Sequence, residues 1–207
     1  MRLTYLDQYH FFNATIMPER PVVVKVGVDG IDDLQKMVGM YPKGDIFAYE
    51  ADPRNYDKWL NPAKDLGIYL YNYAIGPTAG GKMKLYRFVN TVSNSEFPRH
   101  THDPNCKLVD SVEVNTKSIV QVADEVKRNI SLLILNCEGG ELHIMRALYD
   151  ESIRKRIDQI CVSFHDPRIY ATKHREEILT KLEPFYHVFR GNCPHGGIPD
   201  YLLILRK

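Results

Sequence analysis

Acidic side chains follow directly after two short apolar stretches of this chain. The stretch 132–135 leads into Glu138 and Glu141, which two glycines separate, and the stretch 46–49 ends on Glu50. Carboxylates can accept hydrogen bonds from hydroxyl groups, move protons or hold a divalent cation. Ligands of open α/β sheets bind outside the carboxyl ends of the strands. We therefore expect these acids to lie in a cleft, together with Asn136.

A glycine-containing turn separates the first apolar stretch from a helical pattern. The stretch 22–26 stops at Gly27, and Val28, Asp29 and Gly30 follow. Glycine lets a backbone approach a ligand closely, and the start of a helix offers free N–H groups. The turn has neither the Gly-Lys-Ser/Thr of a phosphate loop nor the full dinucleotide fingerprint. It indicates a ligand only when it is combined with other features.

Glu50 is such a feature, and Asp52 follows it. Glu50 comes about twenty residues after the glycine turn, which is the spacing of the acid that binds a ribose diol in nucleotide-binding folds. The alternative is a solvated acid before a helix that begins at Pro53. Taken with Gly27, the ribose interpretation is favoured.

A histidine ends the strand that is expected at 157–164. His165 has a side chain whose ordinary pKa suits a general base, and Asp166 follows it. The alternative is a histidine that caps a loop. Side-chain oxygens and nitrogens of Asn136 or Glu138, His165 and Asp166 are also a possible ligand set for a divalent cation.

The polar segment 90–105 is expected to be a long surface loop, and such loops are often functional. Its Arg99, His100 and His102 are candidates for binding substrate hydroxyls, with a solvated loop as the alternative. The spacing of its histidines fits no standard zinc module. Two further candidates for substrate contact lie in other loops, namely Tyr170 and His195.

Short apolar strands alternate with helical patterns over most of the chain. This alternation predicts a mostly parallel sheet that helices cover on both faces. The strands are expected at 22–26, 46–50, 68–75, 132–135 and 157–164, with helices at 118–127, 141–156 and 173–182. The segments 185–189 and 201–205 have no helix between them, so we expect them to pair antiparallel.

Two regions depart from this alternation. Residues 1–20 are expected to form a helix or an arm that packs on the domain. Region 76–107 is expected to be a loop and edge-strand insertion near the active site, with an alternating strand at 82–89. A second alternating stretch, 109–114, follows this region.

The 207 residues fit one domain, 1–207, with 44% hydrophobic and 26% charged residues. The net charge of +1, without a long basic run, does not point to nucleic acid or to an anionic membrane. We expect no membrane insertion and no signal peptide. Cys137 and Cys161 lie in apolar strand patterns, which favours a reducing, cytoplasmic location. The oligomeric state stays open.

Four segments resemble successive motifs of the FkbM-type methyltransferases. They are Val-Val-Val-Lys-Val-Gly-Val-Asp-Gly-Ile at 22–31, Phe-Ala-Tyr-Glu-Ala-Asp-Pro at 47–53, Tyr-Ala-Ile-Gly at 73–76 and Leu-Ile-Leu-Asn-Cys-Glu-Gly-Gly-Glu at 133–141. The family usually has Asp where Lys25 and Asn136 stand, and its second glycine comes one residue later than Gly30. Lys25 is therefore expected either to pair with a neighbouring acid or to meet the methionine carboxylate of the cofactor.

The resemblance implies a Rossmann-like class I methyltransferase fold, a seven-stranded, mostly parallel sheet with an antiparallel last strand. It implies S-adenosylmethionine as the cofactor, with a ribose contact at Glu50. The cofactor-binding set that we expect is Lys25, Gly27, Val28, Asp29, Gly30, Glu50, Ala51, Asp52, Tyr73, Ala74 and Asn136.

The reaction that the resemblance implies is in-line methyl transfer to a hydroxyl of a sugar, free or in a glycan. His165, Glu138 and Asp166 are the expected catalytic residues, with Mg²⁺ or another divalent metal at Glu138 and Asp166 as a variant. The alternative is a catalytically degenerate domain that acts as a binding module, which the residues Lys25 and Gly30 favour.

Overall fold

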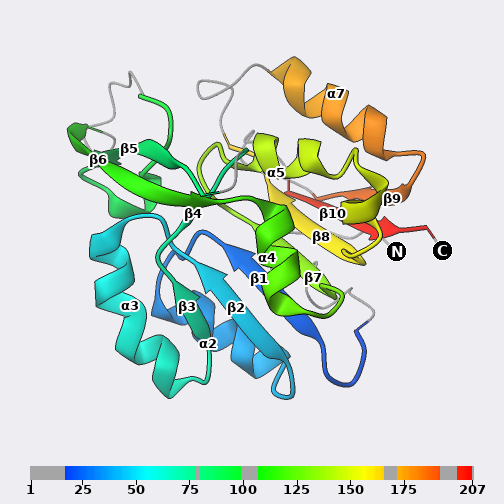
Figure 1. Ribbon diagram of the computed structural model, residues 1–207, viewed down its shortest axis with the longest axis horizontal. Coiled ribbons are helices and arrows are strands. Elements are labelled where there is room, and N and C mark those ends of the chain that lie inside the picture. The colour runs from blue at the N-terminus through cyan, green and yellow to red at the C-terminus, as the bar shows by residue number, and fades with distance from the viewer. Residues whose placement is uncertain (1–16, 78–79, 99–106, 166–171, 192–199, 207) are drawn as a thin grey trace.

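A seven-stranded sheet forms the centre of the computed structural model, which describes residues 17–77, 80–98, 107–165, 172–191 and 200–206 (Figure 1). The strand order is β3-β2-β1-β7-β8-β10-β9. Its strands are β1 Val22–Val26, β2 Asp45–Tyr49, β3 Tyr69–Tyr71, β7 Leu132–Leu135, β8 Gln159–Ser163, β9 Tyr186–Arg190 and β10 Asp200–Leu205. Within this sheet β10 alone runs opposite to the other strands. The predicted fold class is confirmed, and so is the antiparallel pairing of the last two strands.

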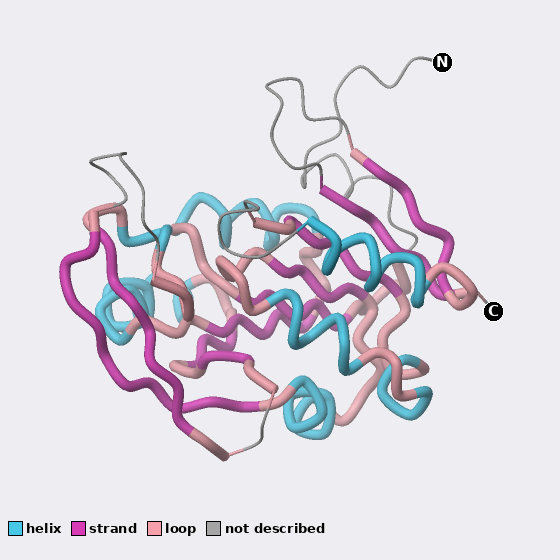
Figure 2. The backbone as a smooth tube through the Cα atoms, turned by 90° about the horizontal axis from the view of Figure 1, so that it is seen from above, coloured by secondary structure: helices cyan, strands magenta, loops and turns pink. Residues whose placement is uncertain are grey.

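Helices cover both faces of this sheet (Figure 2). On one face, α2 Ile31–Met40 and α3 Pro53–Asp65 pack against Val23 and Ile134. On the other, α4 Ile119–Val126, α5 Glu141–Ala147 and α7 Thr172–Leu182 pack against Val24 and Leu133. Successive side chains of a strand point to opposite faces, so an unbroken apolar run supplies both cores. This explains why β1 and β7 are buried along their whole length.

Two predicted elements are divided in the structure. The strand expected at 68–75 ends at Tyr71, and β4 Ala74–Ile75 joins a different sheet. The helix expected at 141–156 is α5 followed by the short α6 Glu151–Arg154. The Asp150 side chain accepts a hydrogen bond from the Ser152 N–H at 2.8 Å, which caps α6 as a new helix.

A second sheet of three strands, in the order β4-β6-β5, lies beside the main one (Figure 1). Its long strands, β5 Lys82–Phe88 and β6 Leu108–Lys117, pair antiparallel, and the 3₁₀ turn η1 Thr91–Ser93 follows β5. The sequence predicted both stretches as alternating strands, and the structure joins them in one hairpin. The predicted arm at 1–20 lies outside the described residues up to residue 16, and 17–20 form neither helix nor strand.

Among the helices that the structure describes, none has both the length and the apolar character that crossing a membrane requires.

Cys137 and Cys161 are free cysteines, as expected.

Lys25 is the exception in the apolar run of β1. Its side chain is fully buried, and its Nζ lies 2.9 Å from Oδ2 of Asp33 on α2. Burial alone would lower the pKa of Lys25, but the carboxylates of Asp33 and Asp29 outweigh it and raise that pKa. Of the two alternatives for Lys25, the structure therefore shows the ion pair, within the core that α2 covers.

Gly27 marks the place where the main sheet opens into loops. Its N–H donates to Tyr49 O at 2.9 Å, and Asn136 N–H donates to Val26 O at 3.1 Å. A Cβ built on Gly27 would lie 1.9 Å from the carbonyl oxygen of Asn136, and φ is +85°. The close contact between the β1 and β7 chains thus requires glycine here.

We predict that Gly27→Ala destabilises the protein by about 3 kcal/mol or more, because a Cβ meets rigid backbone and φ is positive. Urea unfolding followed by circular dichroism measures this. Gly39→Ala on α2 is the control, since nothing lies within 4 Å of its added Cβ. It should change stability by less than about 1 kcal/mol. Equal effects of the two substitutions would contradict the steric explanation.

We also predict that Lys25→Met destabilises the protein by about 3–5 kcal/mol, because it leaves the buried Asp33 carboxylate without its counter-ion. The double variant Lys25→Met/Asp33→Leu should recover most of that loss. Urea unfolding of the two single variants and the double variant checks the coupling. Losses that simply add in the double variant would show that the ion pair is not the cause.

Candidate active site

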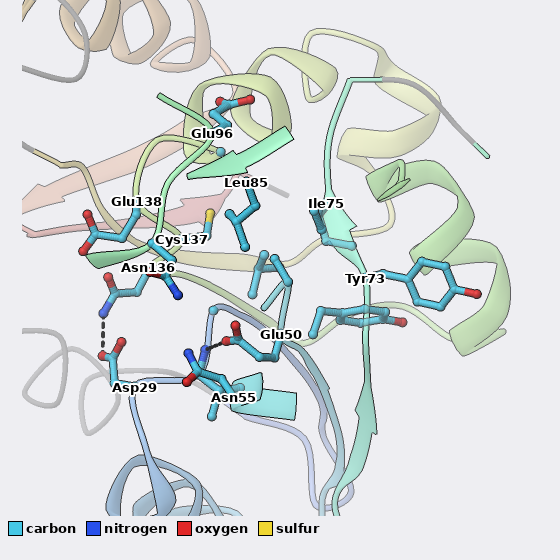
Figure 3. A pocket seen from close by; sticks show the side chains of 18 of the residues that line it. Asp29, Glu50, Asn55, Tyr73, Ile75, Leu85, Glu96, Asn136, Cys137 and Glu138 are labelled. Atoms are coloured by element: carbon cyan, nitrogen blue, oxygen red, sulfur yellow. Dashed lines mark hydrogen bonds between the residues drawn. The ribbon is translucent and has the colours of Figure 1, made fainter. Parts of the chain in front are cut away.

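An open pocket lies at the carboxyl ends of β1, β2 and β7, with about 620 Å³ of empty space when the solvent at its opening is included (Figure 3). The hairpin strand β5 and the segment after η1 form its opposite wall. The residues that line it are Val26, Gly27, Val28, Asp29, Tyr49, Glu50, Ala51, Asn55, Tyr73, Ala74, Ile75, Met83, Leu85, Thr91, Asn94, Glu96, Asn136, Cys137, Glu138 and Gly140. Nine of the predicted site residues are among them, namely Gly27, Val28, Asp29, Glu50, Ala51, Tyr73, Ala74, Asn136 and Glu138.

Glu50 is held rigidly at the end of β2. Its carboxylate accepts hydrogen bonds from the Val28 N–H at 3.1 Å and the Asp52 N–H at 2.8 Å. Burial raises the pKa of Glu50 to about 7, although these two backbone hydrogen bonds act in the opposite direction. A fixed, buried carboxylate with oxygen lone pairs still available suits a diol whose hydroxyls donate to it.

Asp52, Lys25 and Gly30 do not line the pocket. Asp52 is a buried N-cap: it accepts from the Arg54 N–H at 2.9 Å and from Nδ2 of Asn94 at 2.6 Å. It therefore ties the segment after η1 to the start of α3. Gly30 is the N-cap residue of α2. Their expected contacts with the cofactor stay predictions, and in the structure these residues stabilise the strand and helix ends around the pocket.

The side chains of Asn136 and Asp29 meet at the carboxyl ends of β7 and β1. Asn136 Nδ2 donates to Asp29 Oδ2 at 2.8 Å, as the dashed line in Figure 3 shows. Burial raises the pKa of Asp29, while the nearby charge of Lys25 lowers it. The amide at 136 thus has an acid as its partner, so a carboxylate is present at this edge even though residue 136 itself is neutral.

His165 lies between two glutamates. Its Nε2 is 3.0 Å from Oε1 of Glu138, and its Nδ1 is 2.8 Å from Oε1 of Glu141. Glu138 lines the pocket, whereas His165 does not. Glu138 therefore lies between the pocket and His165, which was the expected base.

Glu141 is fully buried at the start of α5. Its carboxylate accepts hydrogen bonds from the N–H groups of Cys137 and Gly139, both at 2.8 Å. Burial alone would raise the pKa of Glu141, but the His165 ring and the Cys137 N–H lower it below its ordinary value. The sequence placed Glu141 at the sheet edge, but nothing in the motif showed that it contacts the histidine.

The backbone of Glu138 is strained. Its φ is +56°, in the left-handed region that costs a residue with a Cβ about 1–2 kcal/mol. The hydroxyl of the buried Ser95 donates to the carbonyl oxygen of Glu138 at 2.6 Å. The segment after η1 therefore helps to hold Glu138 in this conformation. Such outliers are often found at functional sites.

Tyr73, Ile75, Met83 and Leu85 form a mainly apolar wall of the pocket. Lys117 Nζ lies 4.3 Å from the centre of the Tyr73 ring. The hairpin residues were not predicted individually. The alternation of 82–89 and the predicted insertion 76–107 were the only signals, and neither identifies the face that meets the pocket.

Several predicted site residues lie outside the described residues: Arg99, His100, His102, Asp166, Tyr170 and His195. Within the ranges that the structure does describe, no group of three or more His, Cys, Asp or Glu side chains is arranged to hold a metal ion. The metal site expected at Glu138 and Asp166 stays a prediction, because Asp166 lies outside the described residues.

The fold is similar to those of several solved structures. Among them are a fibrillarin/Nop5p complex, a fibrillarin pre-rRNA processing protein from Methanococcus jannaschii and a human methyltransferase 10 domain containing protein. Their TM-scores are 0.56, 0.52 and 0.50, at 10%, 11% and 12% identity. The alignments cover 96%, 92% and 95% of this chain and 79%, 70% and 79% of the other chains, respectively.

At such low identity these structures show the fold alone. No curated protein sequence matches the chain. Residues 25–190, however, match the model of the methyltransferase FkbM domain. The match covers most of the chain and includes the strand ends that carry Glu50, Glu138 and Glu141. The chain therefore belongs to the FkbM methyltransferase family, whose members are class I enzymes that use S-adenosylmethionine.

Proposed function

We propose that this protein transfers the methyl group of S-adenosylmethionine to a hydroxyl of a sugar, free or at the end of a glycan. The observation that carries the proposal is the Glu138–His165 pair. Glu138 lies on the wall of the same pocket as Glu50, at the carboxyl ends of the strands, and a carboxylate in this position can accept a proton.

The pocket residues fit S-adenosylmethionine. The Glu50 carboxylate suits the ribose diol, and the apolar wall of Tyr73, Ile75 and Leu85 suits the adenine ring. The acids Asp29 and Glu138 suit the positive sulfonium and amino groups. When it is bound, S-adenosylmethionine supplies a methyl group that is already activated for transfer to a nucleophile.

The chain's own residues must orient the hydroxyl and receive its proton. A sugar hydroxyl is barely ionised at neutral pH, so a base has to take the proton as the new bond forms. Glu138 is the acid that faces the pocket, and His165 contacts it from behind at 3.0 Å. We assign the acceptance of the proton to Glu138 and the orientation of the Glu138 carboxylate to His165.

The sugar acceptor is the expectation from the family resemblance, with Arg99, His100, His102, Tyr170 and His195 as its proposed contacts. Assistance by Mg²⁺ or another divalent ion at Glu138 and Asp166 is a variant of the same proposal. One structural neighbour is named as a pre-rRNA processing protein. An RNA acceptor is therefore an outcome that the test has to distinguish.

We predict that the affinity for S-adenosylmethionine falls as the pH is lowered from 8 to 6. The pKa of Glu50 is about 7. The ionised form can accept hydrogen bonds from the ribose diol, whereas the protonated form loses part of that capacity. The dissociation constant should rise by up to about tenfold per pH unit well below pH 7. Isothermal titration calorimetry measures it.

Glu50→Gln is the control for this titration. It should bind at least about tenfold more weakly at pH 8, because a charged hydrogen-bond acceptor is lost, and its weak binding should be nearly independent of pH. No binding of S-adenosylmethionine to the wild-type protein at millimolar concentration would refute the enzyme proposal. Unchanged affinity between pH 8 and 6 would refute the role of Glu50.

We predict that Glu138→Gln lowers the rate of methyl transfer by roughly 10²-fold or more while the protein still binds S-adenosylmethionine. The assay follows the methyl group by mass spectrometry in a panel of sugars, glycans and RNA oligonucleotides, with and without EDTA. Glu177→Gln is the matched control, because Glu177 lies exposed on α7 and pairs with Lys181.

Transfer to a sugar hydroxyl supports the proposal, and transfer to RNA overturns its acceptor. Binding of the cofactor with no transfer to any member of the panel would favour the alternative, a binding module that keeps the fold. Loss of activity in EDTA, restored by Mg²⁺, would select the metal-assisted variant.

A further inference from the structure

Glu141 is a buried charge that the proposed reaction does not yet use. Its side chain has no exposed surface and does not line the pocket. An ionised carboxylate in the interior costs several kcal/mol unless hydrogen bonds and a counter-charge compensate it. Two backbone N–H groups and the His165 ring provide that compensation here. The carboxylate therefore stays ionised next to the ring.

The contact with Glu141 determines which nitrogen of His165 carries hydrogen. An ionised carboxylate can only accept, so Nδ1, at 2.8 Å from Oε1 of Glu141, must be the donor. A ring that donates to Glu141 through Nδ1 has Nε2 available to contact a second partner. That nitrogen is the one 3.0 Å from Glu138, on the pocket side. The other neutral tautomer would place a lone pair against the Glu141 carboxylate.

We propose that Glu141 is a positioning residue: it holds His165 with hydrogen on Nδ1 and thereby directs Nε2 at the Glu138 carboxylate, the base that takes the proton. This role rests on the proposed function. As the bond between the acceptor oxygen and the methyl carbon forms, the bond between that carbon and sulfur breaks, and its electron pair stays on sulfur. The proton of the acceptor hydroxyl goes to the Glu138 carboxylate.

His165 lies between two carboxylates, Glu141 on the inside of the protein and Glu138 on the pocket wall. A ring that donates to Glu141 through Nδ1 presents Nε2 to Glu138. A change of the partner at residue 141 therefore changes the contact that orients Glu138, the base of the proposed reaction.

The test is nuclear magnetic resonance of the histidine ring nitrogens in ¹⁵N-histidine-labelled protein, at one neutral pH and with EDTA present. The signals of His165 are those that disappear in His165→Asn. We expect hydrogen on Nδ1 in the wild-type protein. In Glu141→Gln the side-chain amide can donate to Nδ1, so the ring should change to the form with hydrogen on Nε2 only. The control Glu177→Gln should leave the ring unchanged.

Kinetics give the second readout. Glu141→Gln should lower kcat roughly 10²-fold with little change in KM for S-adenosylmethionine. In the His165→Asn background the same substitution should cause no further loss, because Glu141 acts through the ring. A loss that adds fully to that of His165→Asn would overturn the proposal. So would an unprotonated Nδ1 in the wild-type protein, or an unchanged ring in Glu141→Gln.

The two readouts fail separately. The ring measurement needs neither cofactor nor acceptor, so it can support the contact between Glu141 and His165 even if methyl transfer is disproved. If Glu141→Gln does not fold, the wild-type spectrum still decides which nitrogen carries hydrogen. Glu141→Asp keeps the charge and should then keep hydrogen on Nδ1, whereas the loss of that hydrogen in a folded Glu141→Asp would count against the proposal.

Discussion

The contact between the backbone of Gly27 and the carbonyl of Asn136 is the constraint on which the site depends. It brings the ends of β1 and β7 together at a distance that leaves no room for a Cβ on residue 27. The loops that follow these two strands therefore begin next to each other at the pocket. One loop carries Asp29 and the other Glu138, so both acids face a single pocket. Without this contact the strand ends would still exist, but their polar residues would not converge.

Much of the fold was predictable because burial on both faces leaves a simple record in the sequence. Unbroken apolar runs in β1 and β7 indicate central parallel strands, and the closing pair without a helix indicates an antiparallel end. The divided elements were harder to predict. The strand at 68–75 divides because Ala74 and Ile75 pair with β6, which lies some forty residues further along the chain. The helix after Glu141 divides at a local cap, Asp150, within an otherwise continuous helical pattern.

The sequence predicted which residues line the pocket where this depends on position at a strand end, as for Glu50 and Asn136. It was not predictable where a role depends on which side chains meet. Asp52 looked like a ligand-binding acid, but it caps α3 and anchors Asn94. His165 looked like the residue facing the pocket, but Glu138 stands in front of it and Glu141 behind it. Spacing along the chain fixes the level of a residue in the sheet, whereas these contacts depend on side-chain directions and on an insertion whose packing has no sequence signature.

The departures from the family pattern have a common electrostatic explanation. Lys25 forms its ion pair with Asp33 on the face that α2 covers, away from the pocket, so its positive charge is compensated within the core. Asn136 is neutral, but it binds Asp29, which supplies a carboxylate at the same edge. An acidic side chain therefore lies beside each of these two residues. Because Asp29, Glu50 and Glu138 line the pocket, Lys25 and Asn136 do not leave the pocket wall without carboxylates.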